Sequence, residues 1–117
     1  MMPLHPAIHV YLVAGPTDMR KAIDGLALLV ADGLHLDPMS GHLFVFCNRK
    51  RDIIKILYWD HNGFCLWQKR LERQRFPWPQ STDATMKIGV RELRWILDGL
   101  PIHKINGHYR ENYTRIS

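Results

Sequence analysis

Three short apolar segments follow one another in the centre of the chain, and brief polar connections join them. The segments are Leu43–Cys47, Ile53–Trp59 and Phe64–Leu71, each rich in β-branched or aromatic residues that favour strands. The dipeptide Asn62-Gly63 between the second and third segments is typical of a tight hairpin turn. Parallel strands need a long crossover, so connections this short favour an antiparallel meander.

The flanking regions predict one further strand and two helices. Ile8–Ala14 reads as a strand that Gly15-Pro16 ends, and Thr17 is positioned to cap a helix. Apolar residues then recur at helical spacing up to Val30, and Gly33 is a suitable stop. After the meander, residues 86–90 are expected to form a short edge strand and residues 90–98 a short helix. The predicted fold is therefore α+β: a small antiparallel sheet with one amphipathic helix packed on it, plus a short C-terminal helix.

The composition suits one folded domain. The chain has 117 residues, of which 46% are hydrophobic and 23% charged. We expect a single domain over residues 1–100 and a polar tail or docking arm over residues 101–117. Cys47 and Cys65 form no CxxC and lie in apolar runs, as do the reduced thiols of cytosolic proteins. We find no signal peptide and no apolar run long enough to cross a bilayer, so a cytoplasmic location without a membrane partner is expected.

Positive charge is concentrated in one part of the chain. The net charge is +5, and the segment from Arg49 to Arg75 alone contains eight cations and three anions, which accounts for all of it. The cations are Arg49, Lys50, Arg51, Lys55, Lys69, Arg70, Arg73 and Arg75. Concentrated basic charge of this kind is typical of proteins that bind nucleic acid.

The predicted meander brings these cations together. The loop that carries Arg49–Arg51 joins the first two strands, and the third strand returns to the same end with Lys69 and Arg70. Lys55 is expected to lie opposite Lys69 or Arg70, depending on the register of the hairpin. Like charges that face each other are unfavourable, so an anionic ligand such as the phosphates of DNA would relieve the repulsion. The alternative is a solvated edge that discourages aggregation.

Two further features are candidate contacts. Arg20 and Lys21 lie at the junction of the first strand and helix, where free backbone N–H groups can hold a phosphate. An ordinary helix cap with surface charge is the preferred interpretation of that junction. Trp78, between two prolines, is the best candidate among the aromatic residues for an exposed ring that stacks on an unpaired base or contacts a protein partner. The alternative is that these aromatic residues fill the core.

The sequence gives little support for catalysis. Carboxylates such as Asp52 and Asp60 are scattered over turns, the seven histidines lack zinc-site spacing, and there is no P-loop motif. We therefore expect no catalytic residues, no metal site and no cofactor. A small metal-dependent nuclease is kept as an alternative hypothesis.

Several long stretches resemble a known family. These are "TDMRKAIDGLALLV", "LDPMSGHLFVFCNRKRDIIKILYWDHNGFCLWQKRLERQRFPWP" and "ELRWILDGL". They are similar to the small accessory transposition protein of bacterial insertion-sequence-66-type elements, called TnpB or the second-open-reading-frame protein, which is distinct from the RNA-guided nuclease of the same name. The resemblance covers roughly Val10 to Leu100. It implies a mobile-element protein that acts beside a separate transposase and a third small element-encoded protein.

The charge distribution and the resemblance together favour a non-catalytic accessory factor of DNA transposition. Its basic hairpin edge is expected to bind DNA, either at the element ends or without sequence preference. The rival hypothesis is a protein-interaction module that docks on an acidic surface of the transposase and has no DNA affinity of its own.

Overall fold

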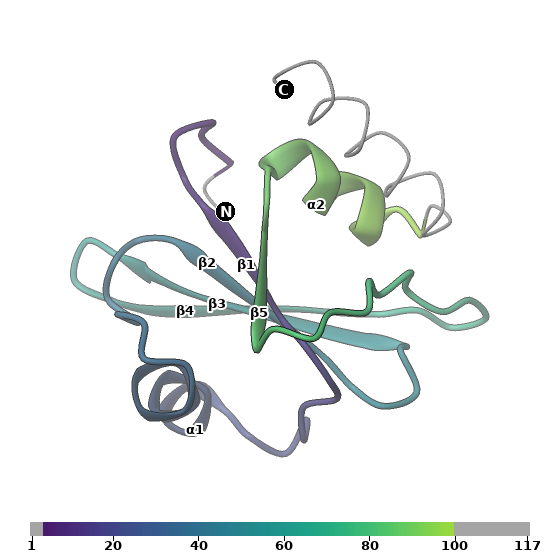
Figure 1. Cartoon of the computed structure of the whole chain (residues 1–117), viewed down its shortest axis with the longest axis horizontal. Coiled ribbons are helices and arrows are strands. Elements are labelled where there is room, and N and C mark those ends of the chain that lie inside the picture. The colour runs from purple at the N-terminus through teal and green to yellow at the C-terminus, as the bar shows by residue number, and fades with distance from the viewer. Residues whose placement is uncertain (1–3, 100–117) are drawn as a thin grey trace.

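The structure, a computed structural model, describes residues 4–99, which form a five-stranded sheet with a helix on each face (Figure 1). The order of the strands across the sheet is β4-β3-β2-β1-β5. The strands are β1 (Val10–Val13), β2 (Leu43–Cys47), β3 (Ile53–Asp60), β4 (Gly63–Arg70) and β5 (Thr85–Ile88). The helices are α1 (Ile23–Leu28), which continues into one π-helical turn, η1 (Leu29–Gly33), and α2 (Val90–Leu97). The α+β class is confirmed.

The sheet is mixed rather than wholly antiparallel. The meander of β2, β3 and β4 is antiparallel as expected, and the hairpin between β3 and β4 turns at Asn62-Gly63. β5 is an edge strand, also as expected, and pairs antiparallel with β1. However, β1 runs parallel to β2, because the chain between them crosses over the sheet through α1.

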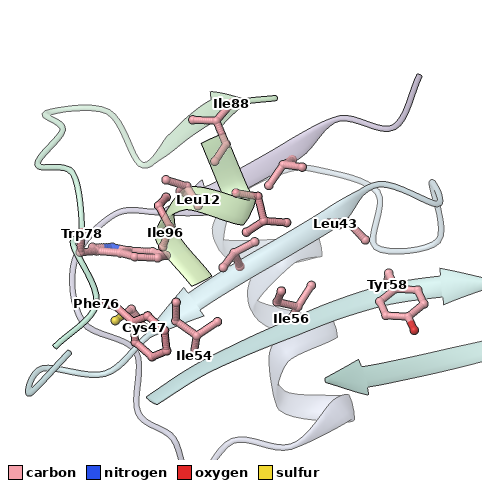
Figure 2. Packing of buried hydrophobic residues seen from close by; sticks show 13 residues of the cluster. Leu12, Leu43, Cys47, Ile54, Ile56, Tyr58, Phe76, Trp78, Ile88 and Ile96 are labelled. Atoms are coloured by element: carbon pink, nitrogen blue, oxygen red, sulfur yellow. The ribbon is translucent and has the colours of Figure 1, made fainter. Parts of the chain in front are cut away.

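Alternating residues of the strands build two separate hydrophobic cores. On one face, Ile54 and Ile56 pack with Leu93 and Ile96 of α2 (Figure 2). On the other face, residues such as Phe44 pack beneath α1 and η1. Every residue of β2 is buried, since this strand lies at the centre of the sheet with a core on each side.

The first helix begins later than the sequence predicts. α1 starts at Ile23, and its N-cap residue Ala22 makes no side-chain capping bond. Thr17 is not the cap: it is buried, and its backbone N–H donates to the carbonyl of Cys47 at 2.9 Å. This bond holds the chain after β1 against the end of β2.

Three further expectations concern the cysteines, membrane-spanning helices and the C-terminal tail. Both cysteines are free thiols, with Cys47 buried and Cys65 half-buried. No helix within residues 4–99 is long and apolar enough to cross a membrane. The expected tail over residues 101–117 lies outside the described residues.

Candidate nucleic-acid interface

The loop between β2 and β3 is held in one shape by Asn48. Its side-chain oxygen accepts hydrogen bonds from the backbone N–H groups of Asp52 at 3.0 Å and Ile53 at 3.1 Å, and its amide nitrogen donates to the Asp52 carboxylate at 2.6 Å. The backbone N–H of Arg51 closes a turn onto the Asn48 carbonyl at 3.1 Å. Arg49 and Lys50 therefore stand exposed at the tip of an ordered turn.

A second basic segment is bound to this loop through its backbone. The N–H of Leu71 donates to the Asp52 carbonyl at 2.8 Å, and the N–H of Phe76 donates to the Arg51 carbonyl at 2.6 Å. The chain between these two anchors carries Arg73 and Arg75, both exposed. Figure 1 shows the two loops at the same end of the sheet, opposite the β3–β4 hairpin turn. The predicted convergence of cations from separate segments is therefore present.

We name this surface the basic end. It consists of Arg49, Lys50, Arg51, Arg70, Arg73 and Arg75, all exposed except the half-buried Arg51. Two carboxylates lie within the same segments. Glu72 pairs with Arg70 at 3.0 Å, and Asp52 accepts the bond from Asn48. Among residues 4–99 the only other ion pair is that of Arg20 with Asp18, so most of the basic end has no carboxylate partner.

Two lysines assigned to the surface from sequence do not belong to it. Lys55 lies opposite Gln68, so its expected pairing with Lys69 or Arg70 is wrong. Its side chain is 9% exposed, and its Nζ donates to the carbonyls of Met19 at 2.8 Å and Lys21 at 2.9 Å. These bonds tie the segment before α1 to β3.

Lys69 points to the opposite face of the sheet. It lies opposite Ile54, and its Nζ donates to the carbonyl of Leu97 at 2.9 Å. Leu97 is the last residue of α2, where the exposed carbonyls and the helix dipole favour a positive charge. Lys55 and its partner Gln68 lie on one face of the sheet, so Lys69, the next residue of β4, lies on the other face. Lys55 therefore binds the segment before α1, and Lys69 binds the end of α2.

One of the two cations of the candidate second phosphate contact is neutralised by an ion pair. Arg20 binds the Asp18 carboxylate through Nε and Nη2, the shortest bond being 2.7 Å. Hydrogen bonds from the Arg20 side chain and backbone hold the pKa of Asp18 at about 2. Lys21 is exposed, but its carbonyl is engaged by Lys55. The interpretation preferred from sequence is an ordinary helix cap with surface charge. The surface charge is present, but the helix cap is wrong, because α1 begins only at Ile23.

Trp78 is buried, so the expectation that its ring is exposed is wrong. Its side chain is 5% exposed and packs with Phe76 in the same core as Cys47 and Ile96 (Figure 2). The prolines on either side of it are buried as well. A ring in this position offers no open face for a base to stack on.

A groove of about 380 Å³ nevertheless adjoins Trp78 at the basic end. Its walls come from the turn after β1, from the Asn48–Arg51 loop and from the segment that follows Trp78. Sequence reasoning assigned no role to Gln80 and Ser81, which line this groove, because no local pattern marks a polar residue that a distant loop will approach.

Comparison with known proteins identifies the family. The model of the family described as IS66 Orf2-like protein matches residues 8–107. The chain belongs to this family. The family consists of transposition-associated accessory proteins of insertion sequences, which confirms the resemblance found in the sequence.

Two relatives of this IS66 Orf2-like protein come from one bacterium. The chain is 38% identical over 100 residues to the uncharacterized protein y4hO of Sinorhizobium fredii, a match that covers 86% of this chain and 87% of the relative. It is 31% identical over 93 residues to the uncharacterized protein y4jC of the same organism, with 80% of each chain covered. No solved structure gives a significant match.

Between residues 4 and 99, the carboxylates of this family member do not converge on a metal-binding position. Asp52 precedes β3 and Asp60 ends it, so the two carboxylates lie at opposite ends of an eight-residue strand. Within the part of the chain that the structure describes, no three His, Cys, Asp or Glu side chains are grouped to hold a metal ion. A two-metal nuclease needs several carboxylates within reach of the same ions.

Proposed function

We propose that this IS66 Orf2-like protein is a non-catalytic accessory factor that binds DNA through the basic end. The observation that supports this most is the pair of backbone hydrogen bonds from Leu71 and Phe76 to the Asp52 and Arg51 carbonyls. They hold two cation-bearing loops side by side, although the arrangement places like charges near one another. Such a surface is suited to a polyanion, whose phosphates offset the repulsion.

The proposed contact is electrostatic and largely independent of base sequence. Arginine and lysine side chains position a protein on DNA by binding phosphate oxygens, and each phosphate neutralised adds about 0.9 to the slope of log K against log salt. If most of the six cations of the basic end contact phosphates, the expected slope is about 3 to 5 in magnitude. The bound DNA would be presented to a separate transposase and a third element-encoded protein.

The test is fluorescence anisotropy with a labelled duplex across a salt series. Two variants each remove two charges of the basic end: one combines Arg49→Ala with Lys50→Ala, and the other combines Arg73→Ala with Arg75→Ala. We expect each variant to bind less tightly at low salt and to lower the slope by as much as about 1.8. All four side chains are exposed, so the fold should be unaffected.

The matched control combines Lys87→Ala with Arg94→Ala. These two side chains are exposed as well, but they lie on β5 and α2 and are not part of the two basic loops. If the control weakens binding as much as the other variants, net charge alone governs affinity and the basic end is not a defined site. If the unaltered protein does not bind DNA even at low salt, the basic end instead serves an acidic protein surface, and the interaction-module hypothesis is favoured.

A further inference from the structure

The groove beside Trp78 has the composition of a site for one nucleotide. Arg49 and Arg51 supply positive charge on one wall, and the exposed Pro16 supplies apolar surface. Its volume of about 380 Å³ falls within the range of small-ligand sites but is far too small for a duplex. The groove therefore differs in kind from the open basic surface around it.

The polar groups of the groove match the parts of a nucleotide. The Arg guanidinium groups are suited to bidentate contact with a phosphate. Gln80 and Ser81 offer amide and hydroxyl groups that both donate and accept hydrogen bonds, as recognition of a base edge requires. No carboxylate is among the described residues that line the groove, so nothing there repels a phosphate.

Trp78 adds an unsatisfied donor. Its indole Nε1 is buried and has no hydrogen-bond partner. A buried N–H group without an acceptor is unusual in a folded protein, because its lost hydration is not compensated. Trp78 lines the groove, so a nucleotide bound there brings acceptor atoms beside a ring whose donor is unsatisfied.

We propose that this groove holds a single unpaired nucleotide of a DNA strand whose neighbouring duplex lies on the basic end. The proposal rests on the proposed function and makes it more specific: the preferred substrate is DNA with an unpaired strand end, not a continuous duplex. The phosphate of the unpaired nucleotide lies at Arg49 and Arg51, and its base lies against Pro16 near Gln80 and Ser81.

The experiment compares a blunt duplex with the same duplex carrying a short single-stranded overhang. We expect the overhang to increase the affinity of the full chain roughly tenfold at fixed salt, the usual effect of one well-held base. The variant Gln80→Trp should abolish this preference by filling the groove. It should leave the salt slope of blunt-duplex binding unchanged, because it removes no cation of the basic end.

Thr82→Trp is the matched control. Thr82 is exposed in the same segment but does not line the groove, so this variant should keep the preference for the overhang. Equal binding of both DNAs by the unaltered protein, or a preference that survives in Gln80→Trp, overturns the nucleotide site and leaves the proposed function standing.

Failure to bind either DNA overturns the proposed function instead. A short single-stranded oligonucleotide then tests the groove by itself, again with anisotropy. Binding that Gln80→Trp removes and Thr82→Trp keeps supports the site even without duplex affinity. Absence of binding, or binding that is indifferent to Gln80→Trp, overturns it.

Discussion

Replacing Lys55 by methionine tests whether this lysine stabilises the fold and makes no contact with DNA. Its Nζ donates two hydrogen bonds, at 2.8 and 2.9 Å, to the carbonyls of Met19 and Lys21. These bonds fasten the turn before α1 to the middle of the sheet. Methionine fills much of the same space as the lysine stem and lacks the ammonium group, so Lys55→Met removes the two bonds with little change in packing.

The size of the effect follows from three contributions. A hydrogen bond from a charged donor stabilises a protein by about 1.5–3 kcal/mol, so two of them set an upper limit of about 3–6 kcal/mol. Met19 is only half-buried and Lys21 is exposed, so water can reach part of the released carbonyls. The variant also avoids the cost of burying an ammonium group. We therefore expect the free energy of unfolding to fall by about 2 kcal/mol.

Urea unfolding measures this change, and the salt dependence of DNA binding provides the second measurement. Lys55→Met should keep the slope of the unaltered protein, whereas the control Lys50→Met should lower it by about 0.9 and change stability by less than about 0.5 kcal/mol. The reasoning is refuted if Lys55→Met is as stable as the unaltered protein. It is also refuted if the folded Lys55→Met variant lowers the slope of log K against log salt by about 0.9, the value expected for the loss of one phosphate contact.

Three other predictions concern single side chains. Asn48→Ala removes the side chain that orders the basic loop and should lower the free energy of unfolding by about 1–2 kcal/mol in urea, with weaker DNA binding. Burial raises the pKa of the Cys47 thiol from 9.0 to about 12, so in a Cys65→Ser background it should not react with Ellman's reagent at pH 8 until the chain unfolds. The folded chain keeps the Cys47 proton that the unfolded chain releases, so this contribution to stability is complete below pH 9 and is lost as the pH rises toward 12. The Asp18 carboxyl should titrate near pH 2 by NMR and return toward 3.8 in Arg20→Ala, whereas an unchanged midpoint would contradict the assigned hydrogen bond.

The part of the fold that could be predicted is the part that local chemistry determines. The short connections and the Asn62-Gly63 turn specify the meander, because nearby antiparallel strands have few other ways to pair. The direction of β1 could not be predicted in this way. The connection that contains α1 is long enough to allow either a parallel or an antiparallel neighbour, and the choice depends on packing across the whole sheet.

The sequence was enough to predict where the candidate site lies, but it identified only some of the residues that form it. Chain direction alone brings Arg73 and Arg75 to the loop that carries Arg49, and the structure has this arrangement. The side-chain roles of Lys55 and Trp78 depend on which distant residues cover them. A lysine among apolar strand residues is a signal for a buried, hydrogen-bonded amine, but its carbonyl partners in the turn before α1 leave no mark in the sequence.

The order of the strands has a consequence for the chain as it is synthesised. β5 completes the sheet by pairing with β1, and its partners Val10 and Ile88 lie at nearly opposite ends of the described chain. Any product that stops before Thr85 leaves the β1 segment "VYLV" with a bare apolar edge. Such edges recruit strands from other molecules. Prematurely terminated or proteolysed copies should therefore associate with one another, and full-length synthesis protects the protein from aggregation.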